Sequence, residues 1–106
     1  GYPTYTASKA GMNSWSKALA KQLAKDGILL NVVAPGSILF PGGAWERRRQ
    51  ENPQFIDNFV KTDMPLGRFG RPEEVSSMVV FLASERASLM SGACVNVDGC
   101  QSRSNI

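Results

Sequence analysis

The chain has 106 residues, of which 42% are hydrophobic and 20% charged, with a formal net charge of +3 and a pI of about 9.1. These values suit one modest globular unit and argue against a low-complexity or disordered chain. No apolar run approaches the roughly 18 residues that a membrane-spanning helix needs, and nothing resembles a secretory leader.

Neither the basic residues nor the cysteines form a recognisable binding motif. Arg47, Arg48 and Arg49 make one run, and no aromatic residues alternate with basic ones as in a nucleic-acid-binding surface. We expect this run to be a solvated loop face, with the binding of an acidic substrate or phosphate as the alternative. There is no histidine, and Cys94 and Cys100 lack metal-ligand spacing, so we expect reduced thiols and no metal.

The first predicted element is a helix over residues 4–25, which Gly27 ends in a left-handed conformation. Tyr5 and Lys9 are four residues apart, so a helix places them on one face. A nearby ammonium favours the phenolate form of tyrosine, which suits an acid/base catalyst. Tyr2 has a threonine four residues later and does not form such a pair. A stripe of small and apolar residues permits close helix packing: Ala7, Ala10, Gly11, Trp15, Ala18 and Leu19.

A nearly unbroken apolar run over residues 28–34 predicts a parallel strand covered on both faces, and Pro35-Gly36 ends it. Asn31 is the lone polar residue in this run. We interpret it as a structural hydrogen-bonding residue rather than a catalyst, because a buried amide must be satisfied by its neighbours.

Residues 37–71 are predicted to form a long connection with a short helix begun by Asn52 and Pro53. Loops of this length are usually functional or mobile. Its apolar residues suggest the lining of a pocket: Phe40, Trp45, Phe55, Ile56 and Phe59. For the last three we favour the other interpretation, in which they hold the short helix against the body of the protein.

A second long helix opens at Arg71-Pro72-Glu73-Glu74, where proline suits the first turn and the acidic pair complements the helix dipole. Its apolar stripe is predicted to be core: Val75, Met78, Val79 and Leu82. A final strand over residues 93–97 is closed by Asp98-Gly99. A strand, a crossover helix and a second strand predict a parallel sheet and an α/β fold.

The Tyr-x-x-x-Lys pattern followed by Asn31-Val32-Val33-Ala34-Pro35-Gly36 resembles the short-chain dehydrogenase/reductase family. Three stretches look like successive segments of that family in order and spacing: YTASKAGMNSWSKALAKQLAKDGILLNVVAPGSI, PLGRFGRPEEVSSMVVFLAS and SGACVNVDG. Only the loop around residues 40–63 departs from it. The resemblance implies that residues 1–106 are the C-terminal half of a Rossmann-type doubly wound parallel sheet. The glycine-rich diphosphate loop and the catalytic serine and asparagine are then expected upstream.

The resemblance also implies an NAD- or NADP-dependent oxidoreductase of a carbonyl/alcohol pair. Tyr5 is then the acid/base, and Lys9 both favours its phenolate form and binds the nicotinamide ribose. Pro35 and Gly36 are expected to shape the nicotinamide site, with the Ile38 backbone meeting the carboxamide. The residues suggested for substrate binding are Ser37, Phe40 and Trp45. Phe40 stands where the family often has threonine, which puts one cofactor hydrogen bond in question.

The substrate stays open, because MPLGRFGRPEEV resembles 3-oxoacyl-carrier-protein reductases and sugar or steroid dehydrogenases alike. The expected partners are a small carbonyl or alcohol substrate and further copies in a homotetramer or homodimer, joined through the first helix and residues 93–106. Neither nucleic acid nor membrane is expected, and the expected location is cytoplasmic. We expect the 106 residues to be inactive alone. The alternative function is a non-catalytic, truncated member that retains only the fold and assembly surfaces.

Overall fold

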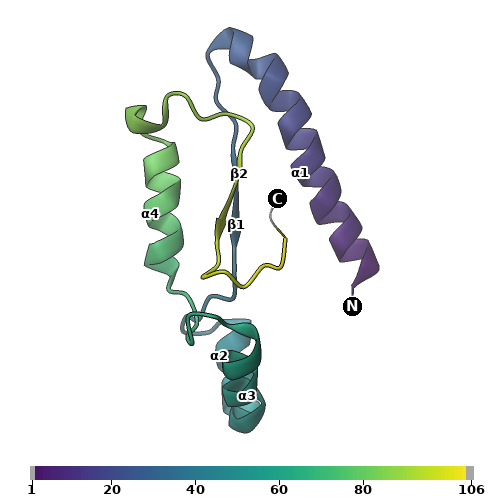
Figure 1. Cartoon of the computed structure of the whole chain (residues 1–106), viewed down its shortest axis with the longest axis vertical. Helices are drawn as coiled ribbons and strands as arrows, with labels where there is room; N and C mark the ends of the chain where they lie inside the picture. The colour runs from purple at the N-terminus through teal and green to yellow at the C-terminus, as the bar shows by residue number, and fades with distance from the viewer. Residues whose placement is uncertain (1, 105–106) are drawn as a thin grey trace. The chain divides into compact units, whose positions relative to one another are not determined.

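The computed structural model describes residues 2–104 of the chain. Figure 1 shows the order of its elements, from the long helix α1 to the strand β2 near the C-terminus. The chain divides into two compact units, the first made of Gly1–Val33 with Val80–Val95 and the second of Ala34–Val79 with Asn96–Ile106. None of the helices within residues 2–104 is long and apolar enough to cross a bilayer.

Helix α1 (Pro3–Leu23) dominates the first unit and confirms the helix predicted over residues 4–25. Pro3 occupies the first turn, where its missing N–H costs nothing. A short 3₁₀ turn (Ala24–Asp26) follows, and Gly27 ends it with a φ of 73°, as predicted. The predicted small-residue stripe is largely exposed here. The buried side of α1 instead carries Ser16 and Ala20.

Strands β1 (Val32–Pro35) and β2 (Cys94–Val97) pair in a two-stranded parallel sheet (Figure 1). The Val32 N–H donates to the Ala93 carbonyl at 2.8 Å, and the Gly36 N–H donates to the Val97 carbonyl at 3.0 Å. The parallel pairing confirms the predicted α/β class.

Strand β1 is shorter than the predicted strand over residues 28–34, because the Leu30 N–H and the Asn31 side chain form hydrogen bonds that involve side chains and do not follow the backbone pattern of a sheet. The Leu30 N–H donates to the Ser91 hydroxyl at 3.2 Å. Asn31 takes part through both ends of its amide, donating to the Met90 carbonyl at 2.9 Å and accepting from the Ala93 N–H at 3.1 Å. The structural interpretation of Asn31 is therefore confirmed. The expectation of a strand covered on both faces is wrong within residues 2–104, since the residues of β1 are half-buried or exposed and Ile28 is 51% exposed.

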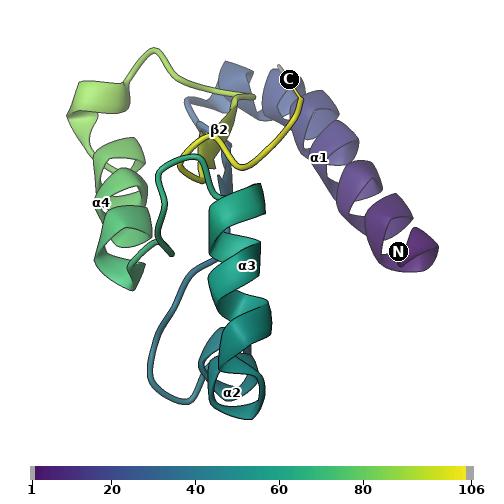
Figure 2. The same cartoon turned by 60° about the horizontal axis from the view of Figure 1, so that its bottom comes forward.

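The second unit contains two helices in the region predicted as a long connection, α2 (Ala44–Glu51) and α3 (Pro53–Asp63) (Figure 2). The arginine run lies on α2 rather than in a loop, although its side chains are exposed as expected. Good helix formers follow Gly43, and Glu46 fixes the helix start by accepting from the Gly42 N–H at 2.7 Å. Arg48 lies over the Trp45 ring, 4.9 Å from its centroid.

Helix α3 starts as predicted, with the Asn52 side chain accepting from the Phe55 N–H at 3.1 Å. Ile56 is 2% exposed and belongs to the core of the unit, and Phe59 stacks on Trp45 with 4.9 Å between ring centroids. These two residues confirm that the apolar face holds the helix in place. The same interpretation is wrong for Phe55, which stacks on Phe59 yet remains 55% exposed.

Helix α4 (Pro72–Leu82) begins at the predicted proline, and a 3₁₀ turn (Glu85–Ala87) follows it. The prediction of a core stripe is wrong: Val75, Met78 and Leu82 are half-buried, and Val79 is exposed. A sheet of two four-residue strands offers too little surface to bury such a stripe.

An ion pair closes the start of α4. Arg68 donates two hydrogen bonds to the Glu74 carboxylate, at 2.8 and 2.9 Å, and the Arg71 N–H donates a third at 3.0 Å. Glu74 therefore satisfies the N-terminal backbone of its own helix while it holds the preceding loop. These bonds from Arg68 and the Arg71 backbone lower the pKa of Glu74 to about 2, and the pair raises the pKa of Arg68.

The Arg68–Glu74 ion pair should make the stability of the fold depend on pH. Because its folded-state pKa is lowered, the Glu74 carboxylate stabilises the fold above about pH 4.3, the usual glutamate pKa, and loses this effect as pH falls toward 2. We expect Glu74→Gln to have a lower melting temperature than the parent protein at pH 7 and a similar one near pH 2. Thermal unfolding across that range measures this. A matched control is Glu73→Gln, and an equal effect of both substitutions would contradict the prediction.

A second prediction follows from the backbone of Cys100, which has a φ of 66°. A side chain is strained in this left-handed region, whereas glycine is not. We expect Cys100→Gly to raise the free energy of unfolding by about 1 kcal/mol. Denaturant unfolding measures this. Cys100→Ala removes the thiol but retains the Cβ atom, so an equal gain from alanine would show that strain is not the cause.

Candidate functional site

Tyr5 and Lys9 lie on successive turns of α1, and the structure brings their side chains together. The Lys9 Nζ atom is 5.5 Å from the centroid of the Tyr5 ring. This arrangement follows from the four-residue spacing in a helix that starts at Pro3. Tyr5 is 62% exposed, so its hydroxyl is accessible to a ligand in the described structure. The predicted juxtaposition of phenol and ammonium is confirmed, whereas its catalytic use stays a prediction.

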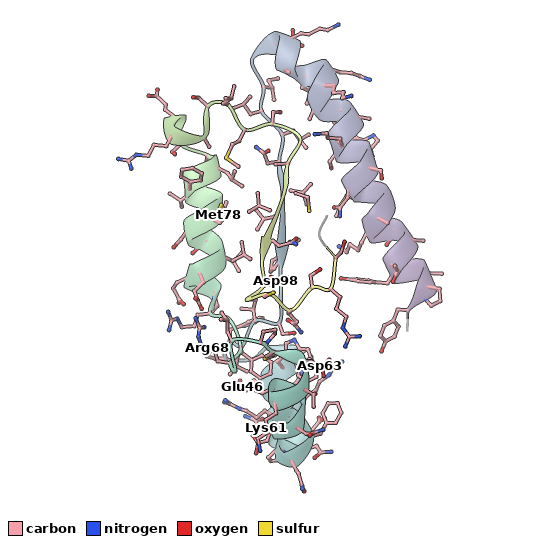
Figure 3. The ribbon with its side chains drawn as sticks, viewed as in Figure 1. Glu46, Lys61, Asp63, Arg68, Met78 and Asp98 are labelled. Atoms are coloured by element: carbon pink, nitrogen blue, oxygen red, sulfur yellow. The ribbon has the colours of Figure 1, made fainter. Side chains whose placement is uncertain are left out.

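The Pro35-Gly36 turn lies in the second unit, at the end of β1. A Cβ atom added to Gly36 would come within 2.8 Å of the Asp98 Cα atom and 2.9 Å of the Gln101 Oε1 atom. Only glycine therefore permits this approach of the segment that follows β2. Figure 3 shows Asp98 in that segment, directly after β2. Its carboxylate accepts from the Cys100 N–H at 3.0 Å and the Ser102 N–H at 2.9 Å, which orders the turn.

Ser37 is held by Gln101. The Ser37 N–H donates to the Gln101 Oε1 atom at 2.9 Å, and the Gln101 Nε2 atom donates to the Ser37 hydroxyl at 3.0 Å. Gln101 was not among the candidate residues predicted from the sequence. The available signal was the parallel pairing of the strands, which brings the residues after both carboxyl ends to the same sheet edge.

Ile38 forms an isolated parallel bridge with Gly70. The bridge uses the neighbours of Ile38: the Gly70 N–H donates to the Ser37 carbonyl and the Leu39 N–H donates to the Gly70 carbonyl, each at 3.0 Å. In such a bridge the N–H and C=O of Ile38 itself point away from Gly70. Within residues 2–104 no hydrogen bond engages these two groups, so they are available to a ligand.

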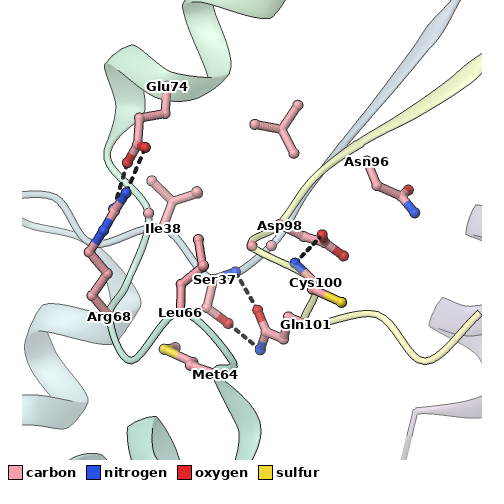
Figure 4. Close-up of a pocket in the computed structure, with 14 residues that line it drawn as sticks. Ser37, Ile38, Met64, Leu66, Arg68, Glu74, Asn96, Asp98, Cys100 and Gln101 are labelled. Atoms are coloured by element: carbon pink, nitrogen blue, oxygen red, sulfur yellow. Dashed lines mark hydrogen bonds and ion pairs between the residues drawn. The ribbon is translucent and has the colours of Figure 1, made fainter.

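A pocket of about 290 Å³ lies where β1 and β2 end, beside Gly36 and Asp98 (Figure 4). Its polar lining includes the Arg68–Glu74 pair, Asp98 and the Ser37–Gln101 pair, and Met64 and Leu66 contribute apolar surface. The volume is at the lower end of that of small-molecule sites.

Of the three residues predicted to bind substrate, only Ser37 lines this pocket. The Phe40 ring lies against Gly43, where an added Cβ atom would be 3.0 Å from it. Trp45 stacks on Phe59 and contacts Phe69, with 5.4 Å between those ring centroids. The aromatic side chains of this unit thus pack mainly on one another.

Within residues 2–104 there is no group of three or more metal-ligating side chains, and both cysteines are exposed and free. The structure therefore contains two candidate groups, each described within its own unit: Tyr5 with Lys9 in the first, and residues 35–38 with Gln101 in the second.

Comparison with known proteins relates this chain to oxidoreductases. A family model described as enoyl-(acyl carrier protein) reductase matches residues 1–101. The chain is 39% identical to the 3-oxoacyl-[acyl-carrier-protein] reductase of Thermotoga maritima, over 93% of this chain and 38% of that protein. It is 45% identical to galactitol 2-dehydrogenase of Rhizobium johnstonii, over 89% of this chain and 35% of that protein. The chain thus spans little more than a third of the length of these relatives.

The fold has close counterparts among solved structures. L-sorbose reductase from Gluconobacter frateurii, solved with NADPH and L-sorbose, matches with a TM-score of 0.84 and 32% identity, over 96% of this chain and 41% of that protein. The α/β arrangement with its parallel strands is thus that of Rossmann-type proteins. With the family match over residues 1–101, this likeness establishes that the chain belongs to the short-chain dehydrogenase/reductase family.

Proposed function

We propose that this chain is the C-terminal portion of a single Rossmann-type domain that catalyses NAD- or NADP-dependent oxidoreduction of a carbonyl/alcohol pair. The observation that carries the proposal is the contact between the Lys9 ammonium and the Tyr5 ring on one face of α1. The family match over residues 1–101 supports it, because that range includes both residues and the loop after β1.

In the proposed reaction Tyr5 donates or accepts the proton that is exchanged with the substrate oxygen. In the reductive direction its hydroxyl donates a proton to the substrate carbonyl oxygen, and in the oxidative direction its phenolate takes the proton of the alcohol. The nicotinamide, when bound, supplies or accepts the hydride. Lys9 places its positive charge 5.5 Å from the centroid of the Tyr5 ring, where it attracts the negative charge that develops on the phenol oxygen during proton transfer.

The residues present fit a nicotinamide cofactor. Lys9 offers three N–H donors, suited to ribose hydroxyls, and no ion pair engages it among the described residues. The Ile38 N–H and C=O match the acceptor and donor of a carboxamide, and Pro35 and Gly36 fix the turn before them. The proposed cofactor-binding residues are therefore Tyr5, Lys9, Pro35, Gly36 and Ile38.

The proposed substrate is a small carbonyl compound or secondary alcohol. Relatives named for 3-oxoacyl, galactitol and sorbose substrates share this chemistry and differ in the rest of the molecule. Ser37 lines the pocket described above, and Phe40 and Trp45 lie in the same unit. We assign these three residues to substrate contacts.

Substitution of the catalytic pair tests the proposal. In the full-length protein that contains this chain, Tyr5→Phe retains the ring but removes the transferable proton. We expect turnover to fall by about 10²- to 10⁴-fold with little change in cofactor affinity. Lys9→Met is expected to lower both turnover and cofactor affinity, because one ammonium serves both. Steady-state kinetics and equilibrium titration with NADPH and NADH measure these effects.

The chain offers matched controls for both changes. Tyr2→Phe alters the other exposed tyrosine at the start of α1, and Lys21→Met removes an exposed ammonium further along the helix. Both variants are expected to behave like the parent protein. Retention of most activity by Tyr5→Phe would refute the catalytic assignment, and failure of the parent protein to bind either cofactor would favour a non-catalytic member of the family.

We also propose that the protein assembles as a homotetramer or homodimer through the exposed face of α1 and the segment from β2 onward, whose last two residues lie outside the described part of the chain. Trp15 on α1 is 62% exposed, with Met12 beside it on the helix. Unpaired apolar surface of this kind is typical of subunit interfaces.

Light scattering after size-exclusion chromatography tests this assembly. We expect the parent protein to be a dimer or tetramer at micromolar concentration and Trp15→Arg to shift it toward smaller species, because a charge cannot be buried unpaired in an apolar interface. Phe55→Arg is the control, since Phe55 is comparably exposed on α3. A monodisperse monomer of the parent protein would rule the assembly out.

A further inference from the structure

We propose that Gln101 is a positioning residue, whose side-chain amide clamps Ser37 and thereby presents the backbone of Ile38 to the nicotinamide carboxamide. The inference rests on the proposed function and extends it to a residue beyond the catalytic pair and the Pro-Gly turn. It assigns to the segment after β2 a role in cofactor binding.

The clamp is a two-point contact between residues far apart in the sequence. The Gln101 Oε1 atom accepts from the Ser37 N–H at 2.9 Å while its Nε2 atom donates to the Ser37 hydroxyl at 3.0 Å (Figure 4). Two bonds to one residue fix the orientation of its peptide group as well as its position. Both residues are half-buried, so water competes less for these bonds than at an open surface.

Gln101 is itself held in place. The Gln101 N–H donates to the Asp98 carbonyl at 3.1 Å. The Asp98 carboxylate accepts from the N–H groups of Cys100 and Ser102, the two residues that flank Gln101 in the sequence. At Gly36 the absence of a side chain lets the Gln101 Oε1 atom approach the turn. The clamp is therefore anchored to a turn that begins directly at the end of β2.

The opposite side of the same segment is fixed by Gly70, through bonds to the Ser37 carbonyl and the Leu39 N–H. Ser37 thus bonds to Gln101 through its N–H and hydroxyl and to Gly70 through its carbonyl. Ile38 follows immediately and retains an N–H and a C=O that no group within residues 2–104 engages. A preordered donor and acceptor bind a carboxamide with less loss of conformational entropy than a mobile loop does.

The experiment uses the full-length protein that contains this chain. Gln101→Met removes both hydrogen bonds at similar side-chain volume. We expect it to weaken binding of NADPH or NADH, whichever the parent protein prefers, by about tenfold. Binding of the matching probe that lacks nicotinamide, 2′-phospho-ADP-ribose or ADP-ribose, should change by less than about twofold, because the loop meets only the nicotinamide end.

Two further variants separate positioning from general stability. Gln101→Glu retains an acceptor for the Ser37 N–H, and the Ser37 hydroxyl can rotate to donate to its other oxygen, so cofactor affinity should recover to within about threefold of the parent value. Gln50→Met makes the same chemical change at an exposed site on α2 and should bind as the parent does. Equal weakening of both probes by Gln101→Met, or no weakening of either, would overturn the inference.

A measurement without cofactor keeps this test independent of the proposed function. Hydrogen exchange of the Ser37 amide should be faster in Gln101→Met than in the parent protein, because its acceptor is lost, and restored in Gln101→Glu. If the parent protein bound neither cofactor, the proposed function would fail. If it bound cofactor while Gln101→Met exchanged and bound as the parent does, only the positioning role of Gln101 would fail.

Discussion

The parallel pairing of β1 with β2 is the constraint on which the candidate group of the second unit, residues 35–38 with Gln101, depends. Hydrogen bonds from Val32 to Ala93 and from Gly36 to Val97 set the register. Parallel strands end at the same sheet edge, so the turn after β1 and the turn after β2 must meet there. Gly36, Ser37, Asp98 and Gln101 lie together for this reason, although 64 residues separate Ser37 from Gln101, to which it is hydrogen-bonded.

Local chemistry then decides what each turn can do. Gly36 permits a backbone approach that any side chain would block. The Asp98 carboxylate accepts hydrogen bonds from the N–H groups of Cys100 and Ser102 in its own turn. The Gln101 side-chain amide is therefore not needed for these groups and bonds to Ser37 instead. The Arg68–Glu74 pair performs a similar task at the far side of the pocket, where it joins the loop after α3 to the first turn of α4. Polar side chains, rather than a large apolar core, order this part of the molecule.

Short-range patterns in the sequence predicted what depends on neighbours along the chain. Helix α1, the left-handed Gly27, the Asn52 cap and the Tyr5–Lys9 contact all follow from spacings of a few residues. The extent of β1 was overestimated, since apolar composition cannot show that Asn31 and Leu30 bond to residues 90–93 through other geometry. Helix α2 was missed because its arginine run carries no apolar periodicity. The Gln101 clamp requires the strand register, which no local pattern contains.

We propose that Tyr5 and Lys9 in the first unit, and the Ile38 backbone in the second, each bind the nicotinamide end of the cofactor. A crystal structure of the full-length protein with NADP⁺ or NAD⁺ bound tests it most directly. We expect the Lys9 ammonium at the nicotinamide ribose, the Tyr5 hydroxyl beside the nicotinamide ring, and the Ile38 N–H and C=O on the carboxamide. A bound cofactor whose nicotinamide contacts neither Tyr5 nor Ile38 would contradict it.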